Sequence, residues 1–285
     1  MGWLLVLLSL ALPLVEGEPG EVGGCQRFVE IEDQPYVASL QKIAEGHVCT
    51  ATLITTRWLL TAAQCIVDRE GKPLPAADYF VLMGSSNFTN QIALKVGQRG
   101  WPDLFVVHPM FKTEQTLDYD VGLIRLQSKL VMSRRVSYVP LPDDVIPEEI
   151  LHGLNCTVAG WGKIKEKSPK KQRRLVKLQL RLVDTPNCSQ SLQRQLRGHV
   201  HLCSFQDKIL CGGDTGSALI CQDVQVGVVS WCMMCADRRP GVYARVDTQL
   251  AWLLQVISGA PPVLPLPGAA LCAAWTLAAA ALSWR

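Results

Sequence analysis

The stretch CTATLITTRWLLTAAQC, residues 49–65, contains two short apolar runs, and a cysteine stands at each end. The first run is rich in β-branched residues, which favour extended backbone. Similar runs recur as far as residue 246, bounded by Gly, Pro, Asn and Asp, among them PYVASLQ, YFVLMG, VGLIRL, CTVAGWG, VKLQLRLV and GVYARV. Many short strands at such intervals predict an antiparallel β-sandwich or β-barrel.

The composition is that of a globular chain with a large core. It has 285 residues, of which 48% are hydrophobic, and a formal net charge of +3. This length allows one β-rich domain or two halves, and the net charge is too small to indicate nucleic acid by itself. After the last predicted strand, the segment DTQLAWLLQVI, residues 247–257, has the apolar spacing of an amphipathic helix.

Eleven cysteines indicate an oxidising compartment. The N-terminus agrees with this, because MGWLLVLLSLALPLV is a continuous apolar run that is followed by small residues. The run is too short to span a bilayer, so residues 1–17 are predicted to be a cleaved signal peptide rather than a membrane helix.

A second apolar segment occupies residues 259–285. Residues 261–284 contain no charged side chain, and the small residues SGA (258–260) come directly before them. This pattern predicts a signal for a glycosylphosphatidylinositol (GPI) anchor. A single-pass membrane helix and a disordered tail are the alternatives, although two prolines shorten the uninterrupted apolar run.

Six segments, taken in chain order, resemble the trypsin-like (chymotrypsin-fold) serine proteases. They are QPYVASLQ, CTATLITTRWLLTAAQC, DYDVGLIRL, CTVAGWG, CGGDTGSALIC and VVSWCMMCADRRPGVYARV. The resemblance covers residues 21–258 as one protease-like domain. It implies an all-β fold of two six-stranded antiparallel β-barrels with the active site between them, closed by a C-terminal amphipathic helix.

The resemblance assigns the three positions of a catalytic triad, but two of them hold unusual residues. Asp120 stands at the carboxylate position, Gln64 at the imidazole position and Thr215 at the nucleophile position. A carboxamide cannot shuttle a proton near neutral pH, so we expect the base to be lost. Gly213 and Thr215 occupy the oxyanion-hole positions. No other histidine is expected to replace the base, the five being His47, His108, His152, His199 and His201.

The specificity pocket implied by the resemblance also departs from the family. Ile209 stands where trypsin-like members carry an aspartate, and Cys232 stands where a glycine is usual. Ser230 and Gly241 keep their expected residue types. We therefore expect any remaining pocket to be small and apolar.

The maturation signal is altered as well. EVGG, residues 21–24, resembles the segment that forms the new N-terminus in the family and inserts its ammonium against an aspartate, here Asp214. Gly20 precedes it, so the basic residue needed for cleavage is missing. Cleavage after Arg27 is an alternative. Maturation in the family's manner is not expected.

The resemblance implies four disulfides, Cys49–Cys65, Cys156–Cys221, Cys188–Cys203 and Cys211–Cys235. Cys25 and Cys232 remain, and they pair either with each other or with a partner. Cys272 lies in the C-terminal tail. Three sequons for N-glycosylation occur, at Asn87, Asn155 and Asn187.

A basic cluster falls in a loop between two predicted strands. Its members are Lys163, Lys165, Lys167, Lys170, Lys171, Arg173, Arg174 and Lys177. The cluster is either a solvated loop or a site for polyanions such as glycosaminoglycans or anionic cell surfaces.

Together these features predict an inactive serine protease homologue that is secreted or anchored at the cell surface and acts by binding. One alternative is a weak peptidase that uses Thr215 as its nucleophile with Asp120. Another is a polyanion-binding effector that uses the basic cluster. We expect no cofactor, no metal and no nucleic acid, and a protein partner that the sequence does not identify.

Overall fold

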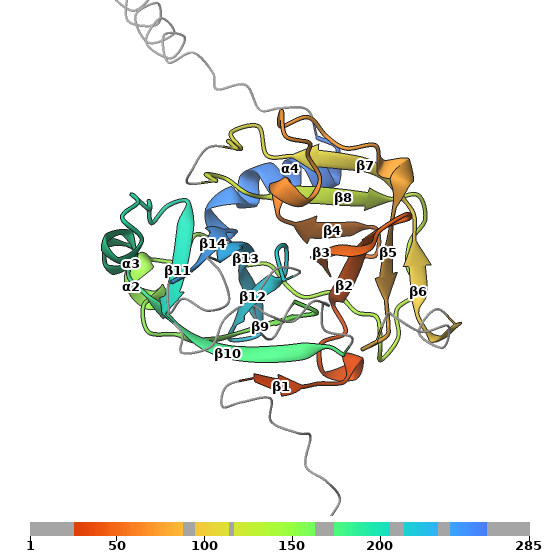
Figure 1. Ribbon diagram of the computed structural model, residues 1–285, viewed down its shortest axis with the longest axis horizontal. Helices are drawn as coiled ribbons and strands as arrows, with labels where there is room; N and C mark the ends of the chain where they lie inside the picture. Colours follow the sequence, from red (N-terminus) through yellow and green to blue (C-terminus); the bar gives the residue numbers. More distant parts are fainter. Residues whose placement is uncertain are drawn as a thin grey trace, which may run out of the picture. The chain divides into compact units, whose positions relative to one another are not determined.

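The computed structural model describes residues 26–87, 95–113, 117–162, 174–205, 214–232 and 240–260. Its regular structure is mostly β-strand, arranged in two antiparallel sheets that, apart from the first strand, follow one another along the chain (Figure 1). Each sheet curls towards a barrel. The all-β fold of two barrels is therefore confirmed.

The N-terminal sheet has the strand order β6-β5-β2-β3-β4-β8-β7. Apolar side chains such as Leu53, Leu60 and Leu123 are fully buried in it. Tyr79 of β5 and Phe105 of β7 pack edge to face with ring centroids 5.5 Å apart, which brings the sheet close to closure. The strands are β2 (Val37–Lys42), β3 (Gly46–Leu53), β4 (Trp58–Thr61), β5 (Tyr79–Met83), β6 (Gln98–Gly100), β7 (Pro102–Val107) and β8 (Gly122–Leu126).

The C-terminal sheet is a closed barrel of six strands, in the order β10-β11-β14-β13-β12-β9, and β9 pairs back with β10. A further short strand, β1, pairs with β10 from outside this ring. The strands are β1 (Gln26–Phe28), β9 (Asn155–Gly160), β10 (Val176–Val183), β11 (His201–Phe205), β12 (Ala218–Cys221), β13 (Val224–Cys232) and β14 (Gly241–Arg245).

Period-two alternation explains why β10 can close this barrel. Leu178, Leu180 and Leu182 are buried, whereas Gln179 and Arg181 between them are exposed. Successive side chains of a strand point to opposite faces, so the three leucines enter the core together. They join a buried cluster that also includes Val158, Leu219 and Tyr243.

The expectation of six strands in each barrel holds for the closed ring. The N-terminal sheet differs by one strand, because β6 adds a short edge strand to β5. Trp101 alone separates the end of β6 from the start of β7. The chain therefore turns a corner at Trp101.

Three of the four disulfides that the resemblance implies lie within the described residues. They are Cys49–Cys65, Cys156–Cys221 and Cys188–Cys203. Bridges of this kind restrict the unfolded chain and typically contribute about 2–4 kcal/mol each. Cys211 and Cys235, the fourth pair, lie outside the described residues, as do Cys25 and Cys272.

Short helices connect the strands, and a helix ends the described chain. They are η1 (Ile31–Asp33), η2 (Ala63–Cys65), η3 (Ala76–Asp78), α2 (Glu148–Leu151), α3 (Thr185–Leu192) and η4 (Asp247–Gln249), followed by α4 (Leu250–Ser258). The C-terminal helix expected from residues 247–257 is therefore present. The chain forms two compact units, residues 1–250 and 251–285. Among the described residues, no helix is long and apolar enough to cross a membrane.

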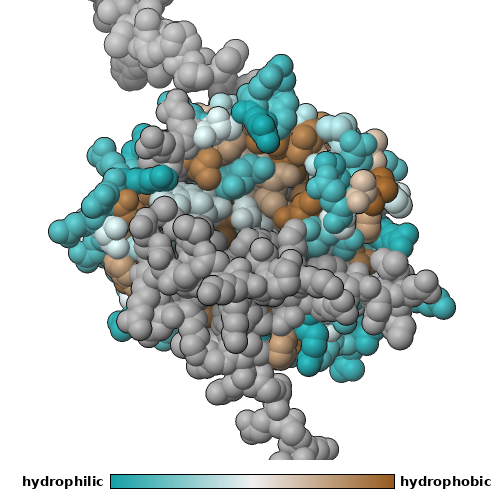
Figure 2. Space-filling model, viewed as in Figure 1, coloured by the Kyte–Doolittle hydropathy of each residue, from teal (hydrophilic) through white to brown (hydrophobic). Residues whose placement is uncertain are grey.

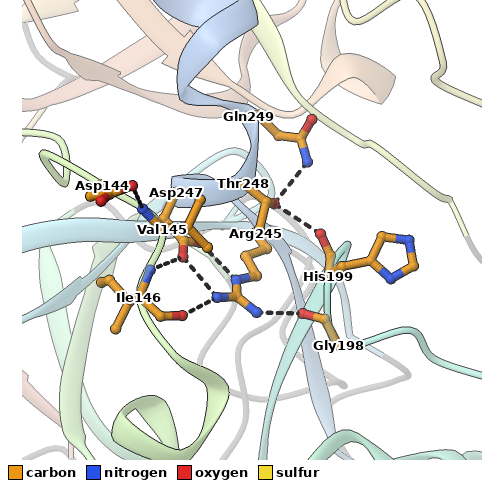
Figure 3. Close-up of polar contacts among 9 residues, drawn as sticks. All are labelled: Asp144, Val145, Ile146, Gly198, His199, Arg245, Asp247, Thr248 and Gln249. Atoms are coloured by element: carbon orange, nitrogen blue, oxygen red, sulfur yellow. Dashed lines mark hydrogen bonds and ion pairs between the residues drawn. The ribbon is translucent and has the colours of Figure 1, made fainter.

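A buried ion pair fixes two loops of the first unit, those containing Ile146 and Gly198, at the end of β14 (Figure 3). Arg245 donates to Asp247 through Nε at 2.7 Å and Nη2 at 2.8 Å, and both residues are buried. Arg245 also donates to the carbonyl of Gly198, and Asp247 accepts from the backbone N–H of Ile146 at 2.8 Å. The pair is thus hydrogen-bonded on both sides, which offsets the loss of hydration.

We predict that Asp247→Ala will destabilise the fold strongly, because it leaves the buried Arg245 guanidinium without its counter-charge. The expected loss of unfolding free energy, measured by denaturant titration, is about 3–5 kcal/mol. The matched control is Glu70→Gln, which removes the exposed Lys72–Glu70 pair and should change stability by less than about 1 kcal/mol. Equal effects of the two variants would contradict this account.

Candidate functional site

Gln64 and Asp120 meet at one end of the N-terminal sheet. Gln64 lies in η2, directly after β4, and Asp120 lies just before β8. β4 and β8 are paired, so these neighbouring ends lie together. The backbone N–H of Gln64 donates to Asp120 Oδ1 at 2.9 Å, and its side-chain Nε2 donates to Asp120 Oδ2 at 2.5 Å.

Ser230 of the C-terminal barrel completes this group. The pairing of β13 with β14 is irregular between Val229 and Trp231, so Ser230 stands in a bulge. Its hydroxyl donates to Asp120 Oδ2 at 2.6 Å, and its carbonyl accepts from Gln64 Nε2 at 2.8 Å. Gln64, Asp120 and Ser230 therefore form one hydrogen-bonded group that joins the two barrels.

Burial dominates the electrostatics of this group. Asp120 is fully buried, and loss of hydration raises the pKa of its carboxyl group. The hydrogen bonds from Ser230 and from the backbone and side chain of Gln64 act in the opposite direction, because they favour the carboxylate. The Gln64 carboxamide donates to this carboxylate, but it has no pKa near neutrality with which to exchange a proton.

Thr215 is held at the same boundary between the barrels through its backbone. Its carbonyl accepts from the N–H of Thr50 in β3 at 2.9 Å. Gly216, which follows it, has φ +87°, and a Cβ there would lie 2.1 Å from the carbonyl oxygen of Thr50. Only glycine permits this approach. Within the described residues, no hydrogen bond joins the Thr215 hydroxyl to Gln64.

Asp214, next to Thr215, is buried against the loop after β9. It accepts from the N–H of Gly162 at 2.8 Å. Gly160 provides the space for it, because a Cβ at Gly160 would lie 2.3 Å from Asp214 Oδ1. The expected partner of Asp214, at Glu21, lies outside the described residues.

The pocket positions are described only in part. The backbone of Cys232 pairs with Gly241, and the side chain of Cys232 is outside the description. Ile209 and the oxyanion-hole position Gly213 also lie outside it. A small, apolar pocket therefore stays a prediction.

The basic cluster is described at two positions, Arg174 and Lys177, and residues 163–173 lie outside the description. The guanidinium of Arg174 stacks over Phe28 at 4.6 Å and pairs with Glu30 at 3.4 Å. Lys177 stands opposite Arg27 on the neighbouring strand, and burial lowers its pKa, with a smaller contribution from the Arg27 charge. Arg174 therefore contacts other groups of the protein, and Lys177 is half-buried.

The three sequon asparagines are within the description. Asn155 in β9 and Asn187 in α3 are exposed, and Asn87 is half-buried. Their glycosylation stays a prediction. Within the described ranges, no group of three or more His, Cys, Asp or Glu side chains is placed to hold a metal ion.

Sequence reasoning missed one member of the site. Ser230 is expected only as a pocket residue, but its hydroxyl and carbonyl bond to Asp120 and Gln64. The bulge leaves the hydroxyl and carbonyl of Ser230 outside the hydrogen-bond ladder, and it depends on the pairing of β13 with β14. A bulge at a residue without glycine leaves no clear signal in the sequence.

We predict that Asp120 makes the stability fall as pH rises. Its pKa is raised in the folded chain, so its contribution is complete below the pKa of the unfolded chain and is lost as pH rises through the folded pKa. The unfolding free energy of the native chain minus that of Asp120→Asn should therefore decrease with pH. Denaturant titrations across a pH series measure this difference.

The control is Gln64→Leu, which removes a side-chain donor that favours the carboxylate. It should raise the pKa of Asp120 further and move the loss of stability to higher pH. A difference between native and Asp120→Asn that increases with pH would rule out this electrostatic account.

Comparison with known proteins places this chain in a family. The family model for trypsin matches residues 24–253. Trypsin of Sus scrofa is 31% identical over 227 residues, which cover 79% of this chain and 90% of the pig protein. Trypsin-3 of Salmo salar is 28% identical over 256 residues, or 88% of this chain and 98% of the salmon protein.

A larger relative matches over a comparable share of this chain. Transmembrane protease serine 9 of Rattus norvegicus is 33% identical over 242 residues, which cover 81% of this chain and 22% of the rat protein. Residues 24–253, which the family model matches, contain the two barrels, the three disulfides and the group around Asp120. On the fold and these matches, the chain belongs to the trypsin-like serine protease family.

Proposed function

We propose that this chain is a serine protease homologue that does not hydrolyse peptides at a useful rate and acts by binding. The observation that carries the proposal is the contact between Gln64 and Asp120. The carboxylate that would orient an imidazole instead accepts two hydrogen bonds from a glutamine, through its backbone and its carboxamide. This arrangement offers no group that could take a proton from Thr215.

The described contacts of other histidines support the proposal. His47 Nδ1 lies 2.8 Å from the Ser39 hydroxyl, and the ring of His47 packs edge-on against Trp161. His108 stacks on Tyr119, and burial lowers its pKa to about 4. Each of these imidazoles has partners away from Thr215. A relocated base is therefore not favoured.

The size of the expected loss in turnover rate decides between a slow enzyme and a binding protein. In triads of this kind, loss of the nucleophile or of the base lowers turnover by about 10⁶, and the losses do not add. An intact oxyanion hole and substrate binding can leave an acceleration of roughly 10³–10⁴ over water. Such a rate is measurable but too slow for a processing enzyme, so binding is the better proposal.

We predict that the purified full-length chain will turn over peptide amide substrates no faster than its Thr215→Ala variant. The competing function, a weak peptidase with Thr215 as nucleophile, requires turnover that this substitution abolishes. Measuring product release over long incubations distinguishes the two. The double variant Gln64→His/Thr215→Ser should gain covalent labelling by a fluorophosphonate, because it regains a base and an unhindered hydroxyl.

The location of the protein extends the proposal. Three disulfides within a trypsin-like fold fit a secretory or extracellular protein. We propose further that the chain is held at the cell surface through a GPI anchor attached near residues 258–260. The small residues there and the uncharged segment 261–284 support this.

We predict that a phosphatidylinositol-specific phospholipase will release the protein from the surface of intact cells into the medium. Immunoblotting of medium and cells after treatment measures the release. The control replaces Ser258, Gly259 and Ala260 with large residues, which should prevent attachment of the lipid. Protein that stays with the membrane after complete digestion would indicate a transmembrane helix instead.

A further inference from the structure

An aromatic and cationic surface lies on the outer side of the N-terminal sheet, away from the group around Asp120. We call it the Trp101 surface, and it consists of Phe80, Arg99, Trp101, Asp103, Leu104 and Arg125. Trp101 is 44% exposed and Leu104 is 37% exposed, while Phe80 is half-buried. Figure 2 shows apolar and hydrophilic residues side by side on the part of the molecule where β5, β6 and β7 lie in Figure 1.

The aromatic part of this surface is a stacked arrangement. The rings of Phe80 and Trp101 have centroids 5.7 Å apart, and the guanidinium of Arg99 lies over the Phe80 ring at 5.5 Å. Trp101 occupies the corner between β6 and β7, where its carbonyl accepts from the N–H of Gln127 at 2.8 Å. Backbone pairing on both sides of the corner therefore holds the main chain of Trp101 in place, and the indole packs against Phe80.

The charged part of the surface is positive. Asp103 is its single acidic member, and this carboxylate pairs with Arg125 at 2.8 Å and with the neighbouring Arg57 at 3.5 Å. Arg125 also lies over the ring of Trp58 at 6.0 Å. Within the described residues, no ion pair joins Arg99 to an acidic group. Arg57, Arg99 and Arg125 thus outnumber the single aspartate, which pairs with Arg125 and Arg57, so the net charge of this region is positive.

Exposed tryptophan and arginine side chains that are held in place are the residues that most often anchor protein–protein contacts. Apolar side chains that are exposed together and bordered by charged residues are typical of interaction sites. The contact between Arg99 and Phe80 also has a local role, because a cation over an aromatic ring stabilises the fold. That role does not require Trp101 and Leu104 to be exposed.

We propose that the Trp101 surface binds an acidic polypeptide segment of a partner protein, one that carries aromatic or aliphatic side chains between its acidic residues. The positive charge selects the acidic groups, and Trp101 and Leu104 require apolar groups to cover them. This inference goes beyond the proposed function, because it uses none of the residues at the group around Asp120. Measurable peptidase activity would overturn the proposed function and leave this surface unaffected.

The experiment uses the purified full-length chain and a fluorescent synthetic peptide in which Glu and Asp alternate with Leu and Phe. Fluorescence anisotropy should report saturable binding that weakens as salt is raised, because screening reduces the electrostatic attraction. Trp101→Ala should weaken binding by at least about tenfold, as expected for an anchor residue. Arg99→Glu should do the same by reversing the charge.

Two control variants test the location. Tyr138→Ala removes another exposed aromatic side chain, and Arg181→Glu reverses an exposed charge on the C-terminal barrel. Neither should change the affinity by more than about twofold, since surface substitutions outside a contact have small effects. Circular dichroism of each variant shows whether the fold is kept.

Comparison peptides test the chemistry. A peptide with Lys in place of the acidic residues, and one with Ser in place of Leu and Phe, should bind at least tenfold more weakly. The inference is overturned if the acidic apolar peptide does not bind, if either comparison peptide binds equally well, or if Trp101→Ala binds as the native chain does. Full displacement of the peptide by heparin, together with equal binding of the Ser peptide, would assign the surface to polysaccharides.

Discussion

The two barrels are joined at a carboxylate that has been removed from water. Asp120 belongs to the N-terminal sheet, yet one of its oxygens accepts the Ser230 hydroxyl of the C-terminal barrel. A buried carboxylate without hydrogen-bond donors has a high free-energy cost. The surrounding backbone and side chains must therefore donate well-aligned hydrogen bonds to it. Gln64 meets this need from its own barrel and also binds the carbonyl of Ser230. The arrangement is a structural solution whether or not any chemistry takes place beside it.

Much of the fold could be predicted because it depends on local patterns. Period-two alternation in β10 and the helical spacing after residue 247 are readable in the sequence. The disulfides follow from a family resemblance that six separate motifs carry. By contrast, the edge strand β6 and the outer strand β1 are only three residues long and pair with distant segments. Strands of this length have no periodicity of their own, so tertiary contacts decide them.

The candidate site likewise has a part that could be predicted from the sequence and a part that could not. Gln64, Asp120 and Thr215 could be singled out as candidates from motifs, because each lies within a conspicuous segment. The contact of Ser230 with Asp120, and the Trp101 surface, could not be predicted. Both arise where a strand is interrupted, at the bulge in β13 and at the corner between β6 and β7. Which side chains meet at such interruptions depends on register, which single residues do not encode.

The disulfide between Cys49 and Cys65 has a consequence for substitutions at position 64, which lies next to Cys65. Cys65 follows Gln64 directly, and the N–H of residue 64 bonds to Asp120 whatever its side chain is. The backbone of residue 64 is therefore held in the same place independently of its side chain. A change at position 64 can replace the chemistry of the site without rebuilding its frame. A frame of this kind can stay folded through an exchange of the side chain at position 64.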